Sequence, residues 1–101
     1  MNKKLLPLGS VVLLEGGNIP VLIISRQPIL NLKSGVCYFD YGAVNQLTGL
    51  ANDQAIYFNH EDIRQIMFEG YVGSNEESIQ KSMLEWLADN PHISKGSVDD
   101  F

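Results

Sequence analysis

The tightest group of side chains that could do chemistry is His60-Glu61-Asp62, in which an imidazole adjoins two carboxylates. These residue types bind metals or exchange protons, but a metal centre needs further ligands at compatible positions. The other histidine, His92, lies in a polar C-terminal stretch. Asn59, directly before the group, is a typical N-cap, so a capping turn accounts for all three residues. The sequence therefore predicts no metal and no cofactor.

An activated nucleophile is not indicated either. The serines do not lie in a Gly-x-Ser-x-Gly turn, and Cys37 in an apolar run is expected to be a buried, unreactive thiol. Gly16-Gly17 links two predicted strands, whereas phosphate-binding glycine loops lead from a strand into a helix. Distant residues can meet in a fold, but nothing in the sequence supports a catalytic site. We therefore predict that the protein is not an enzyme.

Aromatic side chains are the remaining candidates for a binding surface. Those in and near the predicted strands are Tyr38, Phe39, Tyr41, Tyr57, Phe58, Phe68 and Tyr71. Aromatic rings on a small barrel can stack nucleic-acid bases, but that mode of binding needs a basic groove. The simpler interpretation is that most of them build the core. If they bind a partner, the candidate partner-binding residues are Tyr38, Tyr41, Tyr57, Tyr71 and Trp86.

Length and charge limit the classes of partner. The chain has 101 residues, enough for one domain, and its hydrophobic fraction of 45% can form a core. Twelve acidic and seven basic residues give a formal net charge of −5, and the basic residues are scattered. This balance argues against nucleic acid, because phosphate binding needs clustered lysine or arginine. The acidity suits another protein as partner, although solubility alone also explains it.

The compartment is predicted from cysteine content and hydropathy. A single cysteine excludes an intrachain disulfide, so no oxidising compartment is needed. Lys3-Lys4 before Leu5-Leu6 imitates the start of a signal peptide, but Pro7 and Gly9 interrupt it. Apolar runs fall short of the roughly 20 residues that a membrane span requires. We expect a cytoplasmic protein that has no membrane partner.

The elements that must position these residues begin with a hairpin. Runs rich in valine, isoleucine and leucine predict strands at residues 10–15 and 19–25, with Gly16-Gly17-Asn18 as the turn. Three further strands are predicted at residues 36–44, 54–58 and 63–71, and loops at 27–35 and 46–53. In the last strand, Ile66 and Phe68 alternate with Gln65, Met67 and Glu69.

One helix follows these strands. Ser74-Asn75-Glu76-Glu77 is a capping box with Ser74 as N-cap, and Asn90-Pro91 ends the helix, which is predicted over about residues 75–89. Its apolar face is formed by Ile79, Met83, Trp86 and Leu87. Residues 92–101 are polar and are predicted to be a mobile tail. Residues 1–91 are therefore predicted to form a single β-rich domain.

The predicted fold class is α+β, mainly β. We expect a five-stranded, strongly bent antiparallel sheet or a partly open small barrel, with one C-terminal helix covering an edge or an open end. The connections favour a meander, although their lengths allow other strand orders. An uncovered edge could also pair with a second copy, which would give a homodimer by strand addition.

Three stretches together form a recognisable pattern: residues 5–17, residues 21–26 and residues 57–71. The pattern resembles a family of small proteins of unknown function from Firmicutes, and the resemblance covers about residues 5–72. Phe39-Asp40-Tyr41 loosely matches a Tyr-Asp-Tyr-like segment of that family. Its members are often encoded beside type VII secretion loci and LXG-type toxins. The resemblance implies an accessory role for a cytoplasmic protein that binds a secreted toxin or another secretion component, and it carries over no functional residue.

Three hypotheses of function follow. The first is a non-enzymatic protein-binding accessory module, a chaperone or targeting factor for a type VII secretion substrate. The second is an immunity protein that neutralises a cognate toxin, because an acidic chain suits the basic substrate groove of a nuclease. The third is a small-barrel nucleic-acid-binding protein, which the net negative charge disfavours.

Overall fold

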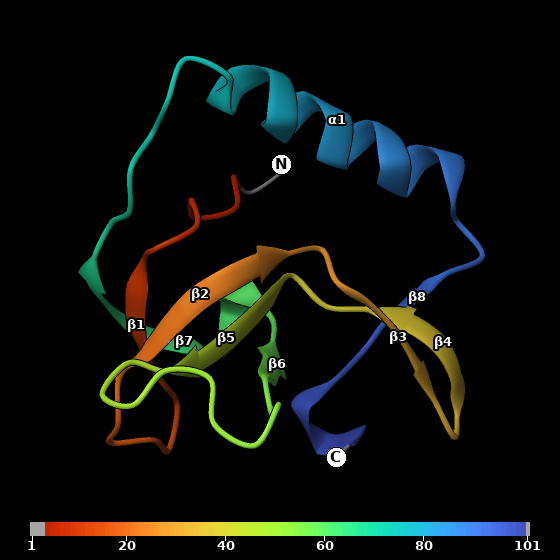
Figure 1. Cartoon of the computed structure of the whole chain (residues 1–101). Helices are drawn as coiled ribbons and strands as arrows, with labels where there is room; N and C mark the ends of the chain where they lie inside the picture. Colours follow the sequence, from red (N-terminus) through yellow and green to blue (C-terminus); the bar gives the residue numbers. More distant parts are fainter. Residues whose placement is uncertain (1–3, 101) are drawn as a thin grey trace.

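The computed structural model describes residues 4–100; the first three residues of the predicted domain and the last of the predicted tail lie outside the described residues. One antiparallel sheet has the strand order β6-β5-β2-β1-β7 (Figure 1). Its strands are β1 (Val11–Leu14), β2 (Val21–Arg26), β5 (Tyr41–Asn45), β6 (Ile56–Phe58) and β7 (Ile63–Phe68). A second sheet has the order β3-β4-β8 and comprises β3 (Ile29–Leu32), β4 (Gly35–Tyr38) and β8 (Ser94–Lys95). The helices are η1 (His60–Asp62), α1 (Glu76–Asp89) and η2 (Val98–Asp100).

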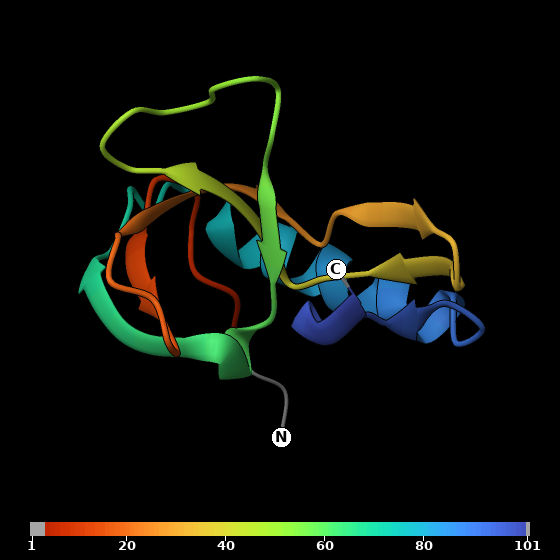
Figure 2. The same cartoon turned by 90° about the horizontal axis from the view of Figure 1, so that it is seen from below.

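The strands form two sheets, and helix α1 extends along both of them (Figure 1). In Figure 1, α1 crosses above the five-stranded sheet, and the N-terminal segment runs between the two. Figure 2 shows the second sheet projecting from one side of the first, where the strand pair β3-β4 lies against the C-terminal segment. The helix therefore bridges from the N-terminal segment to the second sheet.

The predicted fold class is confirmed. The chain is mostly β, with an antiparallel five-stranded sheet and one C-terminal α-helix. The first hairpin also forms as expected, with Val11 opposite Leu22 and Gly16 at a φ of 78° in the turn. Within residues 4–100, β6 and β7 are the two edges of this sheet and do not pair with each other, so the barrel stays open.

The predicted strand at residues 36–44 is wrong as a single element. The chain forms β4, breaks at Phe39-Asp40 and continues as β5 in the other sheet. At the break, the Asp40 amide donates to the Asn59 side chain at 3.1 Å instead of to a neighbouring strand. The predicted loop at residues 27–35 contains β3, because a turn at Lys33-Ser34 returns the chain along β4, which begins at Gly35 with a φ of 124°.

The expected meander is also wrong at its last step. A meander would place β7 beside β6, but β7 pairs with β1, with Leu14 opposite Ile63 and Val11 opposite Phe68. The short η1 turn carries the chain across the open seam of the sheet, where the Glu15 amide donates to the Asp62 carbonyl at 2.9 Å. Both β6 and β7 therefore become edge strands.

The core lies inside the bent sheet. Side chains that are fully or nearly fully buried come from four of its strands and from the N-terminal segment: Leu6, Val12, Val21, Ile23, Tyr41, Ala43 and Phe58. Leu5, Leu14 and Ile63 pack against them and are half-buried. This core uses residues from β1, β2, β5 and β6 and leaves the side chains of β7 outside it beyond Ile63.

Helix α1 is close to its predicted bounds but is capped differently. It begins at Glu76 with Asn75 as N-cap, so Ser74 is not the cap residue that the sequence pattern predicts. Every residue of α1 is at least partly exposed. Polar contacts help to attach it: Arg26 forms two hydrogen bonds to Glu76, and Gln80 donates to the Leu5 carbonyl and accepts from the Leu5 amide.

The C-terminal residues pack on the sheet, in contrast to the mobile tail predicted over residues 92–101. Strand β8 pairs with β4 in parallel, with Cys37 opposite Ser94. Gly96 is buried, its amide donates to the Tyr38 carbonyl at 2.7 Å, and an added Cβ would lie 2.5 Å from the Phe39 ring. The predicted domain boundary at residue 91 therefore leaves out residues that contact the core of the fold.

Candidate interaction surface

The His60-Glu61-Asp62 group forms the turn that the sequence predicts. It is the helix η1, and the Asn59 amide donates to the Asp62 carboxylate at 2.8 Å. The Asn59 side chain also reaches outside the turn, because its Oδ1 accepts from the Asp40 amide and its Nδ2 donates to the Gly96 carbonyl. The Asp62 carboxylate therefore caps the turn, and the Asn59 side chain joins the turn to other segments of the fold.

The imidazole of His60 is connected to the core. The Tyr41 hydroxyl accepts from the Leu6 amide at 2.8 Å and lies 2.7 Å from His60 Nδ1. The hydroxyl therefore links the N-terminal segment to the η1 turn through these two hydrogen bonds. Burial raises the pKa of Tyr41 to about 12, so the hydroxyl stays protonated at neutral pH.

A lysine from the C-terminal segment completes this polar cluster. Lys95 Nζ lies 3.1 Å from Asp40 Oδ2 and 3.2 Å from Glu61 Oε1. Burial alone would lower the pKa of Lys95. The hydrogen bonds and negative charges of Asp40 and Glu61 raise this pKa by more than burial lowers it, so the net shift is upward. Among residues 4–100, the structure holds no group of three histidine, cysteine, aspartate or glutamate side chains arranged to bind a metal ion. The cluster joins β5, η1 and β8.

The five candidate partner-binding aromatic residues do not share one surface. Tyr41 is 0% exposed and belongs to the core, which corrects its place in the candidate set. Tyr38 and Trp86 are half-buried against each other, with ring centroids 6.1 Å apart in an edge-to-face arrangement. Tyr57 is half-buried beside Phe39, whereas Tyr71 is 86% exposed.

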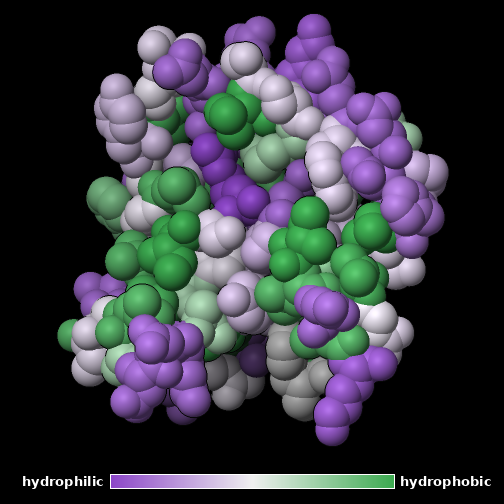
Figure 3. Space-filling view, turned by 45° about the vertical axis from the view of Figure 1, so that its right-hand side comes forward, coloured by the Kyte–Doolittle hydropathy of each residue, from purple (hydrophilic) through white to green (hydrophobic). Residues whose placement is uncertain are grey.

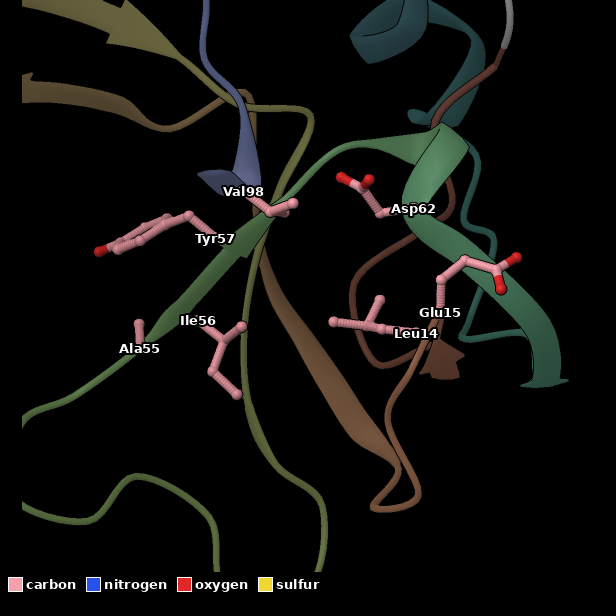
Figure 4. A pocket seen from close by; sticks show the side chains of 7 residues that line it. All are labelled: Leu14, Glu15, Ala55, Ile56, Tyr57, Asp62 and Val98. Atoms are coloured by element: carbon pink, nitrogen blue, oxygen red, sulfur yellow. The ribbon is translucent and has the colours of Figure 1, made fainter. Parts of the chain in front are cut away.

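A pocket of about 470 Å³ lies at the open seam of the sheet. It is lined by Leu14, Glu15, Ala55, Ile56, Tyr57, Asp62 and Val98. Figure 4 shows Leu14 and Ile56 pointing toward each other from β1 and β6, with Asp62 and Val98 at the upper end. The Glu15 carboxylate is directed away from the space between them. The pocket walls are mainly aliphatic, so they provide apolar contact area and few hydrogen-bonding groups.

Strand β7 is the most exposed apolar element of the sheet. Ile66, Met67 and Phe68 are 49%, 50% and 61% exposed, although they are consecutive and therefore lie on both faces of the strand. The alternation of Ile66 and Phe68 along the strand does not show whether their face is covered, and they are exposed because no layer of the described residues covers either face of β7 beyond Ile63. The run of three consecutive apolar residues, Ile66, Met67 and Phe68, is the sequence signal for this exposure, because a strand with one buried face alternates apolar and polar residues.

The apolar surface continues past the end of β7. Tyr71 and Val72 are exposed, and a shallow depression formed in part by Leu8, Tyr71 and Ile79 lies where the chain turns toward α1. On the face shown in Figure 3, hydrophobic side chains likewise reach the surface in several clusters separated by polar ones. Contiguous exposed apolar residues on a folded protein commonly mark an interaction site.

Comparison with known proteins identifies one family. Residues 5–79 match the family described as "Domain of unknown function (DUF4176)". Neither the curated proteins nor the solved structures contain a match to the chain. In residues 4–100, helix α1 and the shorter helices lack the length and hydropathy of a membrane-spanning helix.

Proposed function

Because the chain belongs to the family described as a domain of unknown function, DUF4176, we propose its function from its own surface: it is a non-enzymatic module that binds another protein. The observation that carries this proposal is strand β7, a sheet edge whose apolar side chains are exposed on both faces. Soluble proteins usually blunt such edges, since exposed strand edges template pairing with other chains.

The biological setting that we propose is protein export. The resemblance over residues 5–72 connects the chain with small Firmicutes proteins encoded beside type VII secretion loci. In this proposal the protein acts in the cytoplasm as a chaperone or targeting factor and binds a secreted substrate through β7. A substrate awaiting export exposes apolar segments that an exposed edge strand can pair with.

The experiment is quantitative co-purification from cells that express this protein with each protein encoded by its neighbouring genes. We expect one neighbour-encoded protein to bind stoichiometrically, and the variant Phe68→Ser to weaken binding about tenfold, because an exposed aromatic anchor is lost. Leu47→Ser is the matched control, since Leu47 is also exposed but lies in the loop after β5. Failure of every neighbour-encoded protein to bind would contradict the proposal.

The net charge of −5 supports a second candidate, an immunity protein for a basic nuclease toxin. The two candidates differ in what the bound complex does. An immunity protein protects cells that express the isolated toxin domain, whereas an export chaperone leaves that toxicity unchanged and is needed for secretion. Cell survival with and without the protein, measured beside secretion of the full-length toxin, distinguishes them.

A further inference from the structure

We infer that the free edge of β7 binds an extended polypeptide segment that carries basic residues at both ends and apolar residues between them. This inference rests on the proposed function and specifies the partner. The segment adds a sixth strand to the five-stranded sheet beside Ile63–Phe68. Its apolar side chains cover Ile66, Met67 and Phe68. One basic end lies near Glu69, and the other lies at the end of β7 where Glu15, which follows β1, contributes negative charge.

The backbone of β7 is available for this pairing. Within residues 4–100, β7 pairs with β1 on one side and with no strand on the other. Its six residues include no proline and no lysine, the residues that most often protect an edge. Arg64, its one cationic residue, donates to the Gly17 carbonyl at 2.9 Å and is thereby held toward the turn between β1 and β2. An added strand would satisfy the outward N–H and C=O groups.

The side chains of β7 determine the middle of the partner segment. Ile66 and Phe68 lie on one face of the strand and Met67 on the other, and all three are exposed. Side chains opposite one another on paired strands lie close enough to pack together. A segment with consecutive or alternating β-branched residues would therefore cover apolar area on both faces.

The two ends of β7 determine the charge of the partner. Glu15 lies near the beginning of the strand on its β1 side, because its amide donates to the Asp62 carbonyl, and Glu69 directly follows the strand's last residue. Both side chains are exposed, and within residues 4–100 neither carboxylate takes part in an ion pair. Negative charge at both ends attracts a segment with cationic ends.

The same charges disfavour a second copy of the chain as the occupant. Antiparallel pairing of two β7 strands places the beginning of one beside the end of the other. The end of each copy that carries the charge of Glu15 would then lie beside the Glu69 end of the other copy, and like charges at both ends oppose pairing. A basic segment meets attraction at both ends instead.

The test uses two synthetic peptides with blocked termini and the full-length protein. One peptide has six alternating valine and threonine residues with a lysine at each end; the other has glutamate at each end. We expect the lysine peptide to bind about tenfold more tightly at low salt, with the difference shrinking in 0.5 M salt. Backbone amide resonances of residues 63–69 should shift on binding.

A charge-reversal variant makes the test specific. Glu15→Lys with Glu69→Lys should reverse the preference, so that the glutamate peptide binds more tightly. Glu85→Lys with Asp89→Lys changes the net charge equally but on exposed residues of α1, and it should retain the original preference.

Three results would overturn the inference: no binding of the lysine peptide, equal binding of both peptides, or resonance shifts that exclude β7. A protein dimer that forms through β7 in sedimentation experiments would also overturn it. If a neighbour-encoded protein still co-purifies in any of these cases, the proposed protein-binding function stands and only the site or the partner chemistry is wrong.

Discussion

The side-chain amide of Asn59 donates a 2.8 Å hydrogen bond to the carbonyl of Gly96, 37 residues further along the chain. The same side chain accepts from the Asp40 amide at 3.1 Å, and Asn59 is almost fully buried. One residue therefore joins the break between the two sheets, the η1 turn and the C-terminal segment. This junction makes the C-terminal segment part of the domain.

Replacing Asn59 should destabilise the fold. Asn59→Ala leaves the Asp40 amide and the Gly96 carbonyl without their partner, and buried unsatisfied groups of this kind cost about 1–3 kcal/mol each. We expect the free energy of unfolding, measured in urea, to fall by about 2–4 kcal/mol. Asn31→Ala in β3 is the control, because Asn31 is exposed and should change stability by less than about 0.5 kcal/mol. Equal effects of the two substitutions would contradict the role of Asn59.

Adding a methyl group at Gly96 should release the C-terminal segment. The Cβ of Gly96→Ala would lie 2.5 Å from the Phe39 ring and 3.1 Å from Cys37 Sγ, so either the segment or the core must move. We expect a loss of about 1–3 kcal/mol in unfolding free energy and faster hydrogen exchange at the Gly96 amide. Ser94→Ala, an exposed change in the same segment, should preserve both quantities. Unchanged protection in Gly96→Ala would refute this packing.

Stability should fall at high pH because of Tyr41. Burial raises the pKa of its hydroxyl from 10.0 to about 12, so between these values the folded chain binds more protons than the unfolded chain. The contribution of the protonated Tyr41 hydroxyl to the free energy of unfolding is complete below pH 10 and is lost as the pH rises toward 12. We expect Tyr41→Phe to be less stable at neutral pH and to show a shallower decline above pH 10 in urea titrations. The pKa shifts of Tyr38 and Lys95 are also upward, so some decline should remain in the variant.

The ion pair between Arg26 and Glu76 should weaken in acid. The hydrogen bond from Arg26 lowers the pKa of Glu76, so the pair stabilises the folded state above the usual carboxyl pKa and is lost as the pH falls through the lowered value. Because the pair is partly solvent-exposed, Glu76→Gln should cost less than about 1 kcal/mol at neutral pH. The clearest effect of Glu76→Gln should be a smaller fall in the free energy of unfolding as the pH is lowered into the acid range.

The control for this prediction is Glu77→Gln, an exposed neighbour on the same turn of α1. The fluorescence of Trp86, the chain's one tryptophan, reports whether the helix leaves Tyr38. If Glu77→Gln reduced this fall at acid pH as much as Glu76→Gln, the local ion pair would not be the cause.

Part of the candidate interaction surface could be predicted from the sequence. Tyr71 was chosen as a partner-binding residue and lies exposed next to β7, whereas Tyr41 was chosen on the same grounds and lies in the core. Both residues are tyrosines, so the residue type alone does not distinguish them. What separates them is the number of layers that cover each position, which depends on strand order and not on local sequence.

The sequence by itself determined the elements whose causes are local. Glycine at positive φ reverses the chain at Gly16, and Asn90-Pro91 ends α1, because turn and capping preferences act within a few residues. Only the tertiary structure decided that β7 pairs with β1, that β8 pairs with β4 in a second sheet, and that Asn59 binds Gly96. These contacts join residues tens of positions apart, and their free energy comes from burial and hydrogen bonds that form only once the whole chain has folded. The exposure of β7 follows from them and is therefore a property of the fold.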